Sequence, residues 1–309
     1  MADAALVVLE VVAPIFALIL AGFVAAWRDW ITEAGFRGLN LFAFSFAAPA
    51  LLFASGTAGH SGGGAAALAF FLGTAILYAG TILGARRAGL PLDRAGTLSL
   101  DVVFGNTVMM GIPLITAAYG QQGLAILIAI LALHSMVLLG TATVVAEIAR
   151  NPGAAPLPLL RATAGGVLRN PIVMAVLAAL VWSTLHLPVP GAARHTLELL
   201  GAAAPPVSLF CLGASLRGFS ARGAMGRIAI SVPLKLAALP LLVWAMCRSF
   251  GLSDLETAVA VTTAALPTGA NAFLMATRYA TDPSRSGATV LVSTALSVAT
   301  LSAVLVLMR

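Results

Sequence analysis

The chain has 309 residues, of which 60% are hydrophobic and 9% are charged. Soluble domains carry roughly 25% charged residues, so this composition excludes a soluble globular protein and predicts an all-α protein with several helices in the lipid bilayer. The formal net charge of +6 comes from arginines spread over short connections and not from one basic patch. This distribution argues against a nucleic-acid partner.

Hydrophobic windows bounded by charged residues, glycine or proline predict ten transmembrane helices, each near the ~20 residues that a helix needs to span a bilayer. Their approximate limits are 5–27, 37–56, 65–85, 95–119, 122–148, 167–186, 194–216, 226–248, 255–279 and 286–308. Most arginines, Arg285 among them, fall in the odd-numbered connections, which the positive-inside rule places in the cytoplasm. We therefore expect a multi-pass protein of the cytoplasmic (inner) membrane with both termini outside.

The connection from residue 151 to residue 166 is rich in proline, alanine and glycine, and it divides the chain into two sets of five predicted helices. Residues 1–150 form the first set and residues 167–309 the second. Because five is odd, the second set enters the membrane from the opposite side, which predicts an inverted repeat if both sets share a fold. Short similarities support this repeat: Pro14-Ile15 with Pro171-Ile172, and Ala47–Phe53 with Ala203–Phe210.

Two of the predicted helices, within Arg94–Gly120 and Leu255–Ala280, are interrupted. The first contains Gly105, Asn106, Gly111 and Pro113, and the second contains A-A-L-P-T-G-A-N-A at Ala264–Ala272. Proline has no N–H and its ring clashes with the preceding turn, so we expect the first helix to unwind near residues 105–112. Such backbone at membrane depth survives only inside protein or beside a wet cavity, and two interrupted helices in matching halves point to the binding site of a secondary transporter.

The helix N-termini beyond the two interruptions would direct partial positive charges at one midplane position, which favours an anionic group. Asn106 and Asn271 can donate and accept hydrogen bonds there. Alternatively, these asparagines only satisfy backbone groups that the interruptions set free. The candidate substrate-binding residues are Asn106, Gly111, Ile112, Pro113, Pro267, Thr268, Gly269 and Asn271.

Three ionisable residues inside predicted helices are candidates for coupling or charge pairing, because charges in the membrane are costly and usually functional. Asp101 and Lys235 lie at similar depths, about 10–12 Å from the cytoplasmic side at ~1.5 Å per residue. We predict that Lys235, the only lysine in the chain, either neutralises Asp101 or holds the carboxylate of the substrate; a static pair is the alternative. His134 suits proton coupling, and a neutral histidine bonded to a backbone carbonyl is the competing interpretation.

Five longer motifs resemble the auxin efflux carrier family of membrane transporters, which includes bacterial members for malonate and malate. They are Pro14–Phe23, Phe46–Phe53, Gly105–Leu114, Pro205–Leu216 and Ala265–Tyr279. The resemblance covers nearly the whole chain and implies ten helices in two inverted repeats, with helices 4 and 9 crossing at their interruptions. It also implies a scaffold of helices 1, 2, 6 and 7, a transport domain of helices 3–5 and 8–10, and a homodimer.

We therefore expect a secondary active transporter of a small organic anion, such as an auxin-like or dicarboxylic acid, that works by elevator-type alternating access. A coupling proton or sodium ion stays an open alternative. So does a passive channel, as does an intramembrane serine protease in which Ser61, within the G-x-S-x-G match at Gly59–Gly63, would act with His134. The sequence contains no H-E-x-x-H, C-x-x-C, Walker A or dinucleotide motif, so we expect no metal, no cofactor and no enzyme activity.

Overall fold

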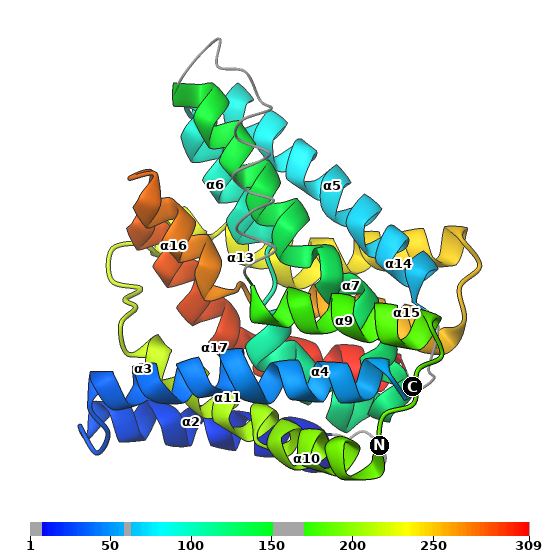
Figure 1. Cartoon of the computed structure of the whole chain (residues 1–309). Helices are drawn as coiled ribbons and strands as arrows, with labels where there is room; N and C mark the ends of the chain where they lie inside the picture. The colour runs from blue at the N-terminus through cyan, green and yellow to red at the C-terminus, as the bar shows by residue number, and fades with distance from the viewer. Residues whose placement is uncertain (1–7, 59–62, 151–169, 309) are drawn as a thin grey trace.

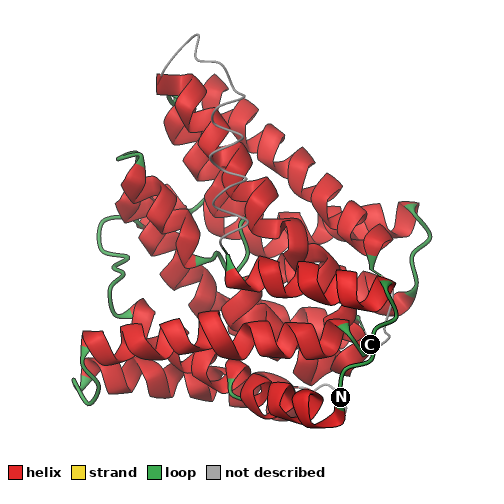
Figure 2. Ribbon diagram, viewed as in Figure 1, coloured by secondary structure: helices red, strands yellow, loops and turns green. Residues whose placement is uncertain are grey.

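The computed structural model describes residues 8–58, 63–150 and 170–308. Within these ranges every regular element is helical and no strand occurs (Figure 2), which confirms the predicted all-α class. The predicted connection 151–166 and Ser61 of the protease alternative lie outside the described residues.

A first bundle contains η1 (Val8–Val12), α2 (Ala13–Trp27), α3 (Glu33–Phe42), η2 (Ala43–Ala47), α4 (Ala48–Gly56), α9 (Pro171–Thr184), α10 (Gly191–Ala202) and α11 (Ala204–Leu216). In Figure 1, α2, α4, α10 and α11 run side by side in the lower part of the molecule, and α9 packs against α4. A proline lies near the start of each of α2, α4, α9 and α11. These prolines are Pro14, Pro49, Pro171 and Pro205. In α9 it follows the extended cap residue Asn170, where the missing N–H would have no helical partner anyway, whereas α2 and α4 continue directly from η1 and η2.

A second bundle contains α5 (Gly64–Arg87), α6 (Leu92–Val103), η3 (Thr107–Gly111), α7 (Ile112–Arg150), α12 (Met225–Ile228), α13 (Ser231–Pro233), η4 (Leu234–Ala238), α14 (Leu239–Ser249), α15 (Asp254–Ala265), α16 (Ala270–Arg278) and α17 (Pro283–Leu307). The long α7 changes direction at Gly120, whose φ of 62° and ψ of −158° are not helical. Only glycine adopts such angles readily. Gly120 therefore separates the predicted spans 95–119 and 122–148.

Seven helical stretches of the described chain are long and apolar enough to cross a membrane. They are Glu10–Trp27, Glu33–Gly56, Gly64–Arg87, Thr107–Arg150, Gly191–Leu216, Met225–Ser249 and Pro283–Leu307. These stretches support a multi-pass membrane protein. The other predicted spans are short or interrupted, since α9 has 14 residues and α6, α15 and α16 have 12, 12 and 9.

Two glycines set the close approach of α2 and α11. A Cβ atom built at Gly22 would lie 1.9 Å from the carbonyl oxygen of Phe210, and one at Gly213 would lie 1.8 Å from the carbonyl oxygen of Ile19. Both distances are far shorter than van der Waals contact, so the two backbones touch only because these residues have no side chain. Small residues allow this kind of close helix packing in lipid.

The contacts between the two halves of the chain occur in corresponding pairs. Numbered by the predicted spans, helix 1 (α2) packs on helix 7 (α11), and helix 2 (α4) packs on helix 6 (α9). Helix 3 (α5) packs on helix 8 (α14). An inverted repeat would make helices 6, 7 and 8 the counterparts of helices 1, 2 and 3. The contact between helices 1 and 7 then corresponds to the contact between helices 6 and 2, and the contact between helices 3 and 8 corresponds to itself.

Candidate functional site

The two interrupted helices meet where both lose their helical backbone. α6 ends at Val103 and η3 begins at Thr107, while α15 ends at Ala265 and α16 begins at Ala270. We call the two linking stretches, residues 104–106 and 266–269, the crossing. They run antiparallel, with a single β-bridge between Gly105 and Thr268.

Hydrogen bonds across the crossing replace those that the helices lose. The N–H of Asn106 donates to the carbonyl of Pro267 at 2.8 Å, and the N–H of Gly269 donates to the carbonyl of Phe104 at 2.9 Å. Buried backbone groups need such partners, so each interruption supplies what the other requires. Leu266, which precedes a proline, has the extended ψ of 145° that this position favours.

Close packing also explains the glycine at residue 269. A Cβ atom at Gly269 would lie 3.0 Å from the ring of Phe104 and 3.1 Å from the carbonyl oxygen of Gly105. A side chain there would push the two linking stretches apart. The glycine therefore keeps the bridge between them short.

The unwound part of the first interrupted helix is shorter than predicted and ends before Gly111. The helix resumes at Thr107 as the π-helical η3, and the carbonyl of Asn106 accepts the N–H groups of Met110 and Gly111 at 3.3 and 3.0 Å. Gly111 closes η3, while Ile112 and Pro113 are the first residues of α7 and are buried. Pro113 follows the π-helical η3 inside the helix that begins at Thr107, so the expectation that the backbone stays unwound as far as residue 112 is wrong.

The remaining predicted residues differ in their surroundings. Pro267, Thr268 and Gly269 lie in the crossing, and Thr268 is fully buried. Its hydroxyl donates to the carbonyl of Asp101 at 2.7 Å, and its N–H donates to Oγ of Ser293 at 3.0 Å.

The two asparagines are not equivalent. Asn106 is buried, and its Nδ2 atom has no hydrogen-bond partner among the described residues. Asn271 lies in the first turn of α16, outside the unwound stretch, and it is exposed. The prediction that both side chains sit within the interruptions is thus correct for Asn106 and wrong for Asn271.

Lys235 is fully buried in η4 and reaches the crossing from the side of α15. Its Nζ donates to the carbonyl of Ala264 at 2.8 Å. A Cβ atom on Gly105 would lie 3.5 Å from this Nζ. Carbonyls at a helix C-terminus carry partial negative charge, which stabilises the ammonium group, but within the described ranges no carboxylate pairs with it.

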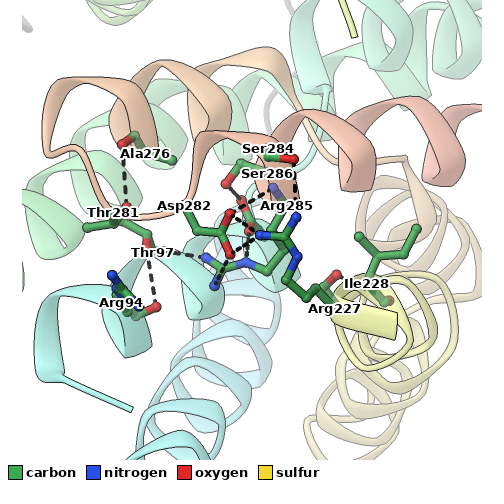
Figure 3. A network of polar contacts seen from close by, with 12 residues as sticks. Arg94, Thr97, Arg227, Ile228, Ala276, Thr281, Asp282, Ser284, Arg285 and Ser286 are labelled. Atoms are coloured by element: carbon green, nitrogen blue, oxygen red, sulfur yellow. Dashed lines mark hydrogen bonds and ion pairs between the residues drawn. The ribbon is translucent and has the colours of Figure 1, made fainter. Parts of the chain in front are cut away.

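Asp101 pairs with Arg285 and not with Lys235, so the first of the two predicted roles of Lys235, to neutralise Asp101, is wrong. Its carboxylate accepts Nε of Arg285 at 3.1 Å and Oγ of Ser286 at 2.5 Å, and all three residues are buried. Arg285 also donates to the hydroxyl of Thr97 at 3.3 Å, as Figure 3 shows. Counting arginines by connection assigned Arg285 to a cytoplasmic loop, whereas Asp282 caps α17 and places Arg285 in its first turn. The sequence Asp282-Pro283, which is typical of a helix start, could have placed Arg285 in the first turn of this helix.

His134 on α7 is fully buried beside the crossing. Its Nδ1 lies 3.5 Å from the hydroxyl oxygen of Thr107, and its ring centroid lies 4.7 Å from that of Phe104 and 6.0 Å from that of Phe70. The bond to a backbone carbonyl in the competing interpretation is absent from the described residues, and Nε2 has no partner there. The surroundings of His134 are therefore aromatic and hydroxyl groups of the same bundle.

Comparison with known proteins shows the family of the chain. Residues 7–305 match the family described as "Membrane transport protein". A protein of Rhizobium meliloti (strain 1021) named "Putative malonate transporter" is 30% identical over 141 residues, which cover 45% of this chain and 44% of that protein. The family and this relative indicate a membrane transporter and not an enzyme. Since the match extends over nearly all of the sequence, the chain belongs to the membrane transport protein family that the motifs resembled, the auxin efflux carrier family.

Proposed function

We propose that this protein is a secondary active transporter that binds a small organic anion at the crossing. The observation that carries this proposal is a set of buried hydrogen-bond donors without acceptors in the part of the chain that the structure describes. Nζ of Lys235 has three N–H groups and one acceptor, and Nδ2 of Asn106 has none. Nε2 of His134 also lacks a partner, and it carries the hydrogen when Nδ1 accepts the hydroxyl of Thr107.

The three donors surround one short stretch of backbone. Lys235 lies against Gly105, Asn106 follows it, and His134 contacts Thr107. The helix that continues through η3 and α7 begins at Thr107 and adds the partial positive charge of its N-terminus. Unused donors and positive charge attract a carboxylate and repel a cation, so this arrangement favours an anionic substrate.

Burial of these donors supports alternating access over a passive channel. Lys235 and His134 are fully buried, and Asn106 is 7% exposed. An anion could reach such groups only after a rearrangement of the helices, whereas a channel offers a continuous polar path. We therefore keep the carrier as the proposed mechanism and the channel as the alternative.

The surface between the two bundles supports an elevator motion. One apolar cluster joins Ile19 and Leu212 of the first bundle to Met110, Leu266 and Val290 of the second. Apolar contacts are not directional, so they allow one bundle to slide along the other, whereas the hydrogen bond from Oγ of Ser55 on α4 to Oε1 of Gln121 on α7 would have to break. We propose that the first bundle is the scaffold and the second is the transport domain.

The exchange of helix contacts between the halves supports two inverted five-helix repeats, 1–150 and 167–309, and ten spans in the cytoplasmic membrane. With an even number of spans, both termini would lie on the same side, which the positive-inside rule makes the outside. A homodimer is the assembly proposed for the scaffold. Labelling of cysteines introduced next to Arg28 and Arg194 with a membrane-impermeant reagent tests the orientation. Only the site next to Arg194 should react in intact cells.

The substrate class proposed is a small organic acid, and malonate is the first candidate because the relative carries its name. The test is uptake of labelled malonate, malate and an auxin-like acid into proteoliposomes, with proton and sodium gradients imposed separately. A carrier should show saturable uptake and counterflow of one of these acids. Uptake of none of them, or unsaturable conductance at ion-channel rates, would contradict the proposal.

A further inference from the structure

A chain of alternating charges leads from the surface of the second bundle to the crossing. Nη1 of Arg227 lies 3.0 Å from Asp282, Asp282 lies 3.8 Å from Nη1 of Arg285, and Nε of Arg285 lies 3.1 Å from Asp101. Figure 3 shows Arg285 between Asp282 and Thr97. The outermost side chain, that of Arg227, is 48% exposed, and that of Asp101 is 0% exposed. Only the inner end of this chain touches the crossing.

Asp101 connects the buried ion pair to the backbone of the crossing. Its carboxylate is held by Arg285 and Ser286, while its own carbonyl oxygen accepts the hydroxyl of Thr268. Ser293, two turns further along α17, accepts the N–H of Thr268. Thr268 in turn forms the β-bridge with Gly105, so α17 holds the crossing at two points.

From these contacts we propose that Arg285 is a positioning residue, which holds Asp101 and through it the register of the two linking stretches. The proposal rests on the proposed function, because the register decides where the unused donors of Lys235 and Asn106 point. Small misplacements of binding groups can cost ~100-fold in rate. The ion pair therefore acts on substrate affinity although it does not contact the substrate.

The same geometry assigns Asp101 to this fixed role and not to ion coupling. Both carboxylate oxygens have a donor, Nε of Arg285 for Oδ2 and Oγ of Ser286 for Oδ1. A sodium ion placed there would meet the guanidinium group of Arg285 at close range, which is repulsive. Any coupling ion is thus expected to use other groups.

A buried ion pair could also serve stability alone, and the test must separate the two roles. Removing one partner strands a buried charge and destabilises the fold, whereas removing both partners leaves no uncompensated charge. The decisive variant is therefore the double substitution Asp101→Asn with Arg285→Gln. Arg285→Lys tests the geometry separately, because lysine keeps the charge but cannot donate from a planar fork to both Asp101 and Thr97.

Two readouts decide the question. The first is KM for uptake in proteoliposomes, beside the melting temperature of the purified protein. The second readout needs no substrate. It is the distance between two spin labels, one at Arg94→Cys on α6 and one at Thr277→Cys on α16, both of which are exposed positions. The labels are placed in a background that lacks Cys211 and Cys247, the free cysteines of the described residues.

We expect the double variant to melt near the wild-type temperature, to raise KM about tenfold or more, and to broaden the label distance. Arg285→Lys should also raise KM with the melting temperature nearly unchanged. Arg227→Gln, at the exposed end of the same chain of charges, is the matched control and should change neither readout. Wild-type KM and wild-type label distances in the folded double variant would overturn the proposal.

A further variant keeps the proposal testable if the double variant does not fold. Ser286→Ala removes one of the two donors to Asp101 without stranding a charge, and it should raise KM about tenfold or more, as expected for a hydrogen bond to a charged group. An unchanged KM and label distance in Ser286→Ala and Arg285→Lys would also overturn the proposal. If the wild type takes up no acid, the proposed function fails, and the label distances alone then decide the positioning role.

Discussion

Replacement of Lys235 by methionine separates a substrate ligand from a structural support. Methionine has a similar length, so it fills the space beside Gly105 but offers no charge and no donor to Ala264 or to an anion. A hydrogen bond to a charged group contributes about 1.5–3 kcal/mol. At ~1.4 kcal/mol for each factor of ten, the variant should raise KM about 10- to 100-fold.

Stability should respond differently, because the described residues give Lys235 no carboxylate partner. A buried charge without a counter-charge costs several kcal/mol of desolvation, and exchange of buried charges for apolar residues of similar volume is often neutral or stabilising. We therefore expect the melting temperature of Lys235→Met to stay level or to rise. The matched control is Arg248→Met on the neighbouring α14, at an exposed position, which should leave KM unchanged.

The measurement combines KM in proteoliposomes with thermal unfolding of the purified protein. A large fall in melting temperature with an unchanged KM would refute the reasoning, since it would mean that Lys235 only supports the end of α15 through the carbonyl of Ala264. A rise in KM of similar size for the Arg248 control would also refute it. In that case the effect of charge would be general and not local to the crossing.

Three further substitutions give independent checks. Gly213→Leu should destabilise the protein by about 1–3 kcal/mol or more, as overpacking does, because its side chain would meet the backbone of Ile19; Gly38→Leu, where nothing lies within 4 Å, is the control in the same thermal unfolding assay. Asn106→Leu should raise KM about two- to tenfold, the range of a neutral hydrogen bond, with no loss of stability. An unchanged KM would mean that Asn106 does not bind the substrate and only satisfies backbone groups at the interruption. His134→Phe keeps an aromatic ring but removes Nε2, so it should raise KM by a similar factor; a lower melting temperature with the same KM would mark His134 as a packing residue.

The interruptions could be predicted from the sequence, because proline and glycine change the backbone conformation only of residues close to them in the chain. Leu266 and Pro267 show this directly, since the extended residue before proline ends α15 close to where the sequence indicated. Pro113 shows the limit of the rule. The helix starts again at Thr107, before this proline, so Pro113 lies inside the helix directly after the π-helical η3 and does not mark where the helix begins.

Partners between distant helices were not predictable in the same way. Asp101 and Lys235 were predicted to lie at similar depths in the membrane, but depth does not give the rotation of a helix about its axis. Arg285 pairs with Asp101 because Asp282 and Pro283 begin α17 early enough to bring its first turn against α6. The cap was readable from the sequence, whereas the face of α17 that meets α6 depends on the packing of the whole second bundle.

The buried charges near the crossing do not cancel, and this imbalance links the site to its substrate. The described residues bury three charged side chains, Asp101, Lys235 and Arg285. With Lys235 protonated they sum to one positive charge, because Asp101 and Arg285 compensate each other. Uncompensated charge in a low-dielectric site is costly, so a single carboxylate of the proposed substrate would complete the neutrality of the crossing. A dicarboxylate such as malonate brings one negative charge more, and its transport would then require a further cation or a protonated carboxylate to move with it.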